Sequence, residues 1–257
     1  NIILEPEGKN TAPAIGLAAM ILSQKDPQSI MVALHADHFI RDEKNFLDVL
    51  KQAEALAHRN YLVTLGITPR APHTGYGYIK RKSNVPKLQA NAYLIEQFCE
   101  KPEKKKAELF FKDKNYFWNS GIFVWKSSVI LKEIEHHLPD LSKKLKALGP
   151  APKINTSLWG QIKSISVDYG ILEKSKKAAV IVAEDIGWSD LGSWAALSEF
   201  LPRDKSGNIL QGDCMDWGSK NIAVWGGKHL IATIGLRNLF IVDTPDALLV
   251  CDKDQTE

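Results

Sequence analysis

Two acidic motifs place carboxylates where they could bind a metal ion. Asp37 follows an apolar run in "HADHFI", and Asp190 stands in "GWSDLGSW". Two carboxylates from distant segments would form a good site for a hard cation if they converge, because Mg²⁺ takes oxygen ligands together with substrate phosphates. The alternative is that each acid caps a local turn, and for Asp37 taken alone this alternative is favoured.

Three further motifs fit the recognition of a polar ligand. "HTGYGYIK" contains Gly75 and Gly77, which suit either a hairpin-like turn or a close approach of the backbone to a ligand. "EKP" places Glu100 and Lys101 at an expected strand end, as a surface ion pair or as a sugar-hydroxyl acceptor beside a phosphate-binding ammonium group. "WNSGIF" offers Asn119, either a turn former or a bidentate ligand for hydroxyl groups.

Alternating strands and helices must position these residues. Apolar spacing predicts helices over 12–24 and 42–59, and apolar runs predict buried strands at 29–40 and 61–67. Strand, helix and strand joined by short links favour a crossover unit with a parallel sheet, in which ligands collect at the carboxyl ends of strands. Asp37 lies at such an end.

The rest of the chain departs from simple alternation. We expect strands at 75–81, 92–102 and 120–125, and helices at 104–113 and within 127–148. From residue 204 onward, short β-rich runs are separated by turn residues, with almost no helical period. The predicted domains are therefore 1–203 and 204–257.

Composition limits the class of protein. The chain has 257 residues, 44% hydrophobic and 25% charged, which is typical of globular proteins, and a net charge of +3 does not indicate a nucleic-acid partner. Cys99, Cys214 and Cys251 are far apart and support neither a disulfide framework nor a zinc site, so we expect a reducing, cytoplasmic compartment. No apolar run reaches the roughly 18 residues that span a bilayer, so no membrane partner is expected. The oligomeric state stays open, homo-oligomers included.

Taken in order, the motifs point to one family. The succession "LEPEGKNTAPAIGLAA", "HADHFI", "TGYGYIK", "EKP", "WNSGIFVW", "SVDYGILEKS" and "GWSDLGSW" closely resembles the mannose-1-phosphate guanylyltransferases of the sugar-nucleotidyltransferase superfamily. The resemblance covers nearly the whole chain and implies an α/β fold. It implies a Rossmann-like nucleotidyltransferase domain with a mixed, mainly parallel sheet, followed by a small C-terminal β-helix-like domain.

The same resemblance leads us to expect that part of the domain is missing from the sequence. Family members begin with a strand and a Gly-rich loop that grips the nucleotide phosphates, and nothing here corresponds to it. His35 also stands where the family usually has proline, which affects the turn more than the chemistry.

The activity implied by the resemblance is transfer of GMP from GTP to α-D-mannose 1-phosphate, giving GDP-mannose and pyrophosphate for glycan or polysaccharide precursors. Mg²⁺ is the implied cofactor, and GTP and mannose 1-phosphate are the implied small-molecule partners. Two alternatives stay open. One is a non-catalytic relative that binds sugar nucleotides. The other is a bifunctional protein with mannose-6-phosphate isomerase activity in a further C-terminal domain.

The resemblance also implies residue roles. Asp37 and Asp190 would hold Mg²⁺ and, with Lys101, form the catalytic set, in which Lys101 offsets phosphate charge. Gly77, Glu100 and Asn119 would address the mannose hydroxyls, and Asp168 would order the wall near Lys101. The full set of implied substrate-binding residues is Glu5, Pro6, Asn10, Thr11, Gly75, Tyr76, Gly77, Glu100, Asn119 and Asp168.

Glu5 has a chemical reason to select the base. Guanine presents N1–H and N2–H₂ side by side as donors, and a carboxylate accepts two such bonds, whereas adenine lacks this donor pair. Glu5 at a strand end is therefore predicted to favour GTP. The alternative is that Glu5 helps to cap the helix at 12–24, a task that Asn10 or Thr11 could also perform.

Overall fold

The computed structural model describes residues 2–83, 87–149 and 154–255, and the chain divides into two compact units. One unit consists of residues 1–36 and 40–188, and the other of residues 37–39 and 189–257. Segment 37–39 thus belongs with the C-terminal part of the chain. The boundary that the sequence predicts between residues 203 and 204 stays a prediction.

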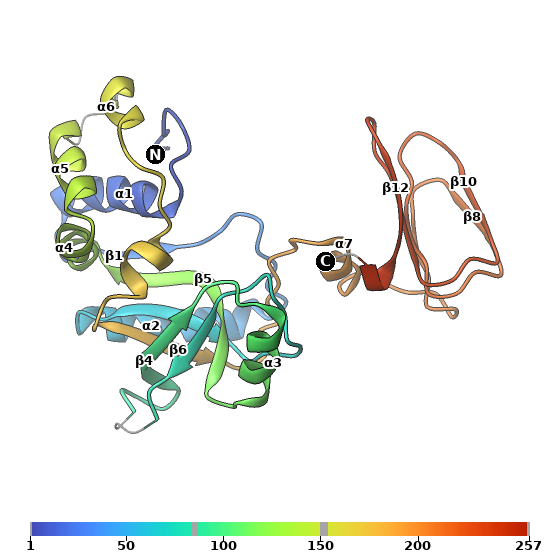
Figure 1. Cartoon of the computed structure of the whole chain (residues 1–257), viewed down its shortest axis with the longest axis horizontal. Coiled ribbons are helices and arrows are strands. Elements are labelled where there is room, and N and C mark those ends of the chain that lie inside the picture. The colour runs from blue at the N-terminus through green and yellow to red at the C-terminus, as the bar shows by residue number, and fades with distance from the viewer. Residues whose placement is uncertain (1, 84–86, 150–153, 256–257) are drawn as a thin grey trace. The chain divides into compact units, whose positions relative to one another are not determined.

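The first unit is built on a six-stranded sheet with the order β1-β5-β2-β6-β4-β3 (Figure 1). Its strands are β1 (Ile30–Ala33), β2 (Leu62–Ile67), β3 (Tyr78–Arg81), β4 (Ala92–Cys99), β5 (Tyr116–Lys126) and β6 (Ala178–Ala183). The sheet is mixed, as predicted. The expectation that it is mainly parallel is wrong when the strand pairs are compared. Strands β2 and β6 pair in parallel, whereas the pairs β1–β5, β2–β5, β3–β4, β3–β5 and β4–β6 are antiparallel.

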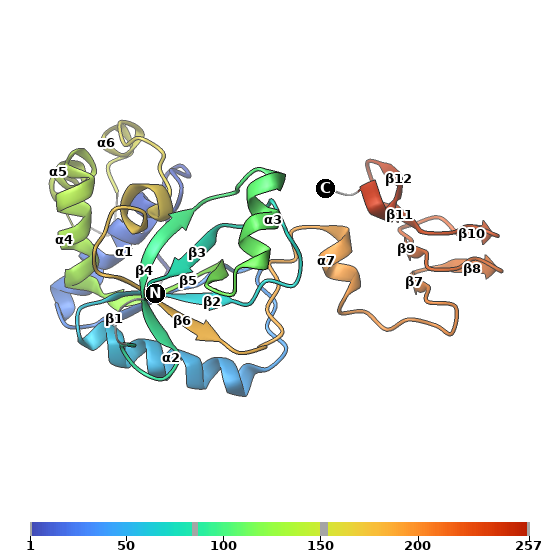
Figure 2. The ribbon, with the colours of Figure 1, turned by 60° about the horizontal axis from the view of Figure 1, so that its bottom comes forward.

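Helices cover both faces of this sheet (Figure 2). They are α1 (Thr11–Lys25), α2 (Glu43–His58), α3 (Lys104–Lys112), α4 (Ser127–His137), α5 (Pro139–Leu148) and α6 (Thr156–Gly160), with a π-helical turn at Asp168–Leu172. One core includes buried residues of α1, α4 and α5, and the other includes buried residues of α2 and α3. Within the described ranges, no helix combines the length and the apolar character needed to cross a bilayer.

Local sequence explains the best-predicted elements. The side chain of Asn10 accepts a hydrogen bond from the Thr11 backbone N–H at 2.8 Å, which confirms Asn10 as the cap of α1. Asp42 caps α2 through the Asn45 backbone N–H at 2.9 Å. Strand β2, "LVTLGI", is buried along its whole length because helices lie on both faces of the sheet.

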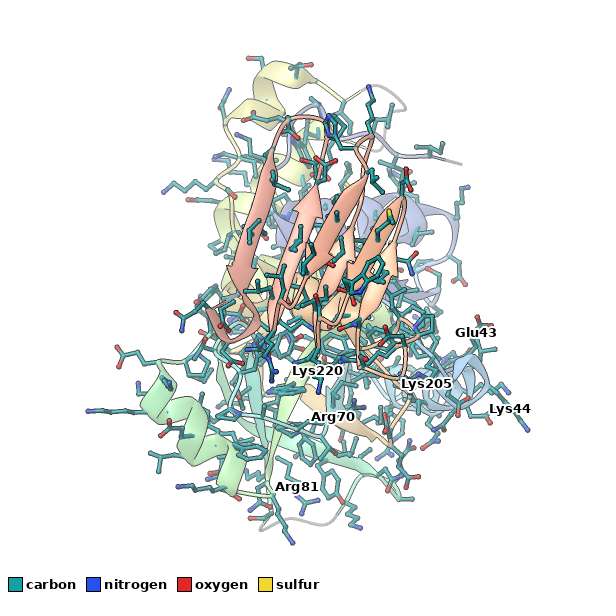
Figure 3. All side chains as sticks on the ribbon, turned by 90° about the vertical axis from the view of Figure 1, so that its right-hand side faces the viewer. Glu43, Lys44, Arg70, Arg81, Lys205 and Lys220 are labelled. Carbon is teal, nitrogen blue, oxygen red and sulfur yellow. The ribbon has the colours of Figure 1, made fainter. Side chains whose placement is uncertain are left out.

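The second unit contains α7 (Trp194–Ser198), β7 (Ile209–Gln211), β8 (Cys214–Trp217), β9 (Ala223–Trp225), β10 (Ile231–Ile234), β11 (Leu239–Asp243), β12 (Leu248–Asp252) and a 3₁₀ turn at Lys253–Gln255. Strands β7, β9 and β11 pair in parallel, as do β8 and β10, while β12 runs antiparallel to β11 (Figure 3). Ile209, Ala223 and Phe240 stack as a small core. This repeated parallel stacking confirms the predicted β-helix-like region.

Candidate active site

A bulge in β5 positions Asn119. Thr64 of β2 pairs with Phe123, and Gly66 pairs with Asn119, so three residues of β5 lie opposite one residue of β2. Gly121 within this bulge has φ 70°, a value that glycine adopts readily. Bulges redirect side chains and occur often beside active sites. The motif "WNSGIF" is therefore part of an eleven-residue strand, and the interpretation of Asn119 as a turn former is wrong.

Asn119 joins two distant segments of the chain. Its Nδ2 donates a hydrogen bond to Asp168 Oδ1 at 2.9 Å, at the start of the π-helical turn. Its backbone N–H donates to the Gly77 carbonyl oxygen at 2.8 Å, just before β3. Three residues predicted to bind substrate thus lie together, although they are separated by up to 91 positions in the sequence.

Gly77 allows Glu100 to lie against the backbone. A Cβ atom at position 77 would stand 2.5 Å from Glu100 Oε2 and 3.4 Å from Asn119 Cβ. The first distance is shorter than real Cβ contacts, so a larger residue at position 77 would displace the end of the Glu100 side chain. A close approach of the backbone to a ligand at Gly77 stays a prediction. We call Gly77, Glu100, Asn119 and Asp168 the Asn119 cluster.

The carboxyl groups of this cluster are partly withdrawn from water. Desolvation raises the pKa of Asp168, while hydrogen bonds from its own backbone and from Asn119, and electrostatic interactions with His35 and Lys101, act to lower it. Desolvation also raises the pKa of Glu100, helped by the negative charge of Asp168 and opposed by Lys101. Ionised carboxylates only accept hydrogen bonds, so a ligand rich in hydroxyl donors matches this cluster.

Lys101 has an unusual backbone conformation. It is exposed, it has φ 43°, and it precedes Pro102, which further restricts the preceding residue. Among the described non-glycine residues with positive φ, four are asparagines and the other two are Lys101 and Leu191. Such strain in other residue types is often found at functional sites. No ion pair with Glu100 occurs in the part of the chain that the structure describes, so the surface-ion-pair alternative is not what the structure shows.

Aromatic packing fixes the segment that leads to Gly77. The Tyr76 ring stacks on the His73 ring with centroids 4.2 Å apart, and it meets the Trp118 ring edge-on at 5.0 Å. The Gly75 backbone N–H donates to His73 Nδ1 at 3.1 Å. Because Trp118 is the neighbour of Asn119 in β5, this packing ties the segment to the Asn119 cluster.

The N-terminal segment is connected to the same region. Thr11 Oγ1 accepts a hydrogen bond from the Val167 backbone N–H at 2.8 Å, next to Asp168. Glu5 and Pro6 lie on the exposed part of this segment, and desolvation raises the pKa of Glu5. Because Asn10 caps α1, the alternative role of Glu5 as the helix cap is wrong.

The two predicted metal ligands belong to the second unit. Phe39 and Ser189 form an antiparallel bridge, with N–H···O distances of 2.8 and 3.0 Å, and this bridge pairs the segments that carry Asp37 and Asp190. Asp190 Oδ1 also accepts a hydrogen bond from the Gly192 backbone N–H at 3.2 Å, as a turn-forming acid would. Metal binding by the two acids stays a prediction.

A set of metal-ligating atoms lies within the motif "HADH" itself. The ligand atoms of His35, Asp37 and His38 lie within 4.8 Å of one another. Imidazole nitrogens favour transition metals, whereas carboxylate oxygens favour Mg²⁺. Of the three, Asp37 has the donor that suits Mg²⁺. Sequence reasoning did not consider the two histidines as ligands.

Sequence reasoning also missed two residues beside the Asn119 cluster. Thr64 Oγ1 donates to Asn119 Oδ1 at 2.9 Å, and the available signal was a single hydroxyl in the otherwise apolar strand "LVTLGI". Glu173 follows the π-helical turn, and desolvation together with the negative charge of Asp168 raises its pKa. Its position in "SVDYGILEKS" was the available signal.

Comparison with known proteins is consistent with this arrangement. Residues 1–206 match the family model described as nucleotidyl transferase, and residues 215–257 match the model described as the MannoseP isomerase/GMP-like beta-helix domain. Mannose-1-phosphate guanylyltransferases of Klebsiella pneumoniae and Salmonella muenchen are 39% and 40% identical over the whole chain. The chain spans 56% and 55% of their lengths, a little over half.

Among solved structures, a Thermus thermophilus protein described as a mannose-1-phosphate geranyltransferase superposes with a TM-score of 0.86 and 29% identity, covering 98% of this chain and 73% of that one. The family model covers the sheet, the helices and the whole Asn119 cluster. The chain therefore belongs to the nucleotidyl transferase family.

Proposed function

We propose that the protein transfers GMP from GTP to α-D-mannose 1-phosphate, with Mg²⁺ as cofactor, and releases GDP-mannose and pyrophosphate. The observation that carries this proposal is the Asn119 cluster, in which an amide and two partly desolvated carboxylates lie together with Lys101 next in sequence. The names of the relatives supply the substrate class.

The cluster suits the sugar half of the substrate. In this proposal, the hydroxyl groups of the sugar donate to Glu100 and accept from the second N–H of Asn119. The sugar thus takes the place of water at groups that the fold has already partly desolvated. Lys101 has electrostatic interactions with both Glu100 and Asp168, and its exposed ammonium group is available to a phosphate at the edge of the cluster. A hexose 1-phosphate matches this pattern of acceptors and one cation.

The reaction needs positioning more than covalent catalysis. A phosphate oxygen of mannose 1-phosphate attacks the α-phosphorus of GTP, the new P–O bond forms, and the bond to pyrophosphate breaks with its electrons leaving on the pyrophosphate oxygen. In the proposal, Lys101 holds the attacking phosphate, and Glu5 accepts from guanine N1–H and N2–H₂. Thr11 anchors the segment of Glu5 beside Asp168 through Val167, so both substrate halves attach to connected segments.

Asp37 and Asp190 are the residues proposed to hold the metal ion. Both offer oxygen donors, which fit Mg²⁺, and the Phe39–Ser189 bridge pairs their segments. A bound Mg²⁺ would neutralise phosphate charge. We also infer a reducing, cytoplasmic location, because Cys99, Cys214 and Cys251 are free thiols.

The test is a coupled assay of pyrophosphate release together with chromatographic detection of GDP-mannose. The full-length protein is given GTP, mannose 1-phosphate and Mg²⁺, and parallel reactions replace GTP by ATP, mannose 1-phosphate by glucose 1-phosphate, or Mg²⁺ by EDTA. We expect product in the first reaction and much less in the others. Asp37→Asn or Asp190→Asn should lower turnover by orders of magnitude, whereas Asp246→Asn, which removes an exposed acid of the same unit, should not.

Two results would contradict the proposal. Binding of GDP-mannose in calorimetry without any transfer would favour the non-catalytic alternative. Normal turnover of both Asp37→Asn and Asp190→Asn, with lowered thermal stability, would assign these acids to turn capping.

A further inference from the structure

Thr64 is a buried threonine whose hydroxyl reaches the Asn119 cluster. Its side chain has no exposed surface, and it lies in the middle of β2, where the flanking side chains are apolar. Its Oγ1 lies 2.9 Å from Asn119 Oδ1 and 3.3 Å from the Ile122 carbonyl oxygen. A hydroxyl at such a position must form a hydrogen bond, because an unpaired buried polar group is costly.

The direction of this hydrogen bond follows from the acceptors. The Gly121 backbone N–H, which can only donate, lies 3.3 Å from Asn119 Oδ1, so this atom is the amide oxygen and not the nitrogen. Two oxygens approach to 2.9 Å only with a hydrogen between them, and the amide oxygen carries none. The hydrogen therefore comes from Thr64, and Asn119 Oδ1 accepts from Thr64 and Gly121.

This arrangement leaves the Asn119 amide one orientation. With Oδ1 held by Thr64 and Gly121, Nδ2 points at Asp168 Oδ1, 2.9 Å away. The opposite orientation would place the amide oxygen against a carboxylate oxygen and the amide nitrogen against the Gly121 N–H. The second N–H of Nδ2 takes no part in the hydrogen bonds of the described residues, and the Asp168 carboxylate, which also accepts from its own backbone N–H, has further lone pairs to offer.

We propose that Thr64 is a positioning residue for the sugar phosphate, which fixes the amide of Asn119 so that Asn119 and Asp168 present one donor and one acceptor to the substrate. This inference rests on the proposed function. Thr64 acts through Asn119 and touches no substrate atom. Its hydroxyl contacts Asn119 directly, whereas the segment of Glu5 is reached through Asp168, Val167 and Thr11, so its effect should be larger on the sugar half than on the nucleotide half.

The test compares Thr64→Val, which keeps the shape and removes the hydroxyl, with Thr64→Ser, which keeps the hydroxyl. In steady-state assays of the full-length protein, Thr64→Val should raise the KM for mannose 1-phosphate about 3- to 10-fold, the effect of one hydrogen bond, and leave the KM for GTP within about twofold. Thr64→Ser should restore the wild-type value. If Thr64→Val does not fold, Thr64→Cys takes its place, because a thiol is a poor donor.

A matched control is Thr233→Val in β10, where another buried threonine donates to Asp216 Oδ1 at 2.7 Å. It should leave both KM values unchanged. Equal changes in the two KM values for Thr64→Val, or no change in either, would overturn the inference.

Absence of transfer by the wild-type protein would refute the proposed function. The role of Thr64 can then still be tested by binding. Calorimetric titration with mannose 1-phosphate then provides the comparison. Weaker binding by Thr64→Val than by Thr64→Ser supports the positioning role, and equal binding refutes it. Failure of the wild-type protein to bind mannose 1-phosphate refutes both proposals.

Discussion

Replacing Gly77 by alanine should displace Glu100 without unfolding the protein. The added Cβ would lie 2.5 Å from Glu100 Oε2, so the carboxylate must retreat by about 0.5–0.9 Å to reach a tolerable separation. The end of a glutamate side chain can make this shift through its own torsions. Gly77 needs no left-handed backbone, so alanine can adopt its conformation.

The magnitude follows from this shift. A hydrogen bond from a sugar hydroxyl to Glu100 that begins near about 2.7 Å would lengthen to about 3.2–3.6 Å, where little of it remains. A hydrogen bond to a charged group contributes about 1.5–3 kcal/mol, so the KM for mannose 1-phosphate should rise about 10- to 150-fold. Alanine also lowers the conformational entropy of the unfolded chain, which stabilises the folded protein by about 0.4–1 kcal/mol. The free energy of unfolding should therefore stay within about 1 kcal/mol of the wild-type value.

Gly160→Ala is the control for Gly77→Ala, because Gly160 also needs no left-handed backbone and lies outside the residues proposed to bind substrate. A Cβ at Gly160 would meet no atom within 4 Å. Steady-state kinetics with both substrates and thermal melts of both variants complete the experiment. The reasoning is refuted if Gly77→Ala keeps the KM for mannose 1-phosphate within about twofold, or if the two alanine variants lose affinity equally.

Three further predictions concern charged residues. Lys101→Ala should raise the KM for mannose 1-phosphate more than the KM for GTP, and an unchanged KM for mannose 1-phosphate would contradict the phosphate role. Lys101→Gly should show the same loss of affinity but melt at a higher temperature than Lys101→Ala, because glycine accepts φ 43° without strain. Glu5→Gln should lower the ratio of kcat/KM for GTP over ATP by roughly tenfold, because it replaces an acceptor by a donor facing guanine, and an unchanged ratio would mean that Glu5 does not read the base. Asp168→Asn keeps an acceptor for Asn119 but removes a carboxyl group whose pKa desolvation raises above its ordinary 3.8. The folded protein therefore binds this proton more tightly than the unfolded chain, and the stability that this group contributes to wild type is lost as the pH rises above 3.8. The melting temperature of the variant relative to wild type should increase as the pH is raised from below 3.8, while turnover is lost, and a difference that does not vary with pH would count against this account.

Elements with strong local signals were predictable from the sequence. The helix at 42–59 has a capping aspartate and a regular apolar period, and the structure has α2 at Glu43–His58. The buried strand at 61–67 matches β2 at Leu62–Ile67 within one residue. In both cases, side-chain spacing and end signals within the element itself determine the conformation, so no distant contact is needed to recognise it.

The direction of strands and the shape of the site depend on distant contacts. Nothing in β5 itself indicates that it runs antiparallel between β1 and β2, since local alternation is the same for both directions. The polar pair Asn119 and Ser120 interrupts the apolar pattern and concealed the start of the strand. Gly121 could have indicated a bulge, because a glycine within a strand often does.

Family resemblance supplied residues that local reasoning could not assemble. Gly77, Glu100, Asn119 and Asp168 lie in four separate motifs, and only the fold brings them together. Thr64 was missed because a threonine in a buried strand is common, since its branched side chain packs well on a sheet. Its importance depends on the Asn119 side chain that it meets, which no local pattern encodes.

The bulge in β5 has a consequence for insertions and deletions. The first half of β5 is locked to β3, where Trp118 pairs with Tyr78, and the second half is locked to β1, where Lys126 pairs with Ile30. Residues 120–122 connect these two fixed registers and contain two more residues than the opposite part of β2. Because both halves keep their pairings, loss of one of these residues would shrink the bulge, and loss of two would leave one residue opposite one residue of β2, so that the bulge disappears. Asn119 would then keep Gly66 as its partner but lose the local backbone distortion that accompanies its contact with Asp168. A scan of single-residue deletions should therefore find residues 120–122 as intolerant as the buried core, and natural length variation should be confined to positions outside this strand.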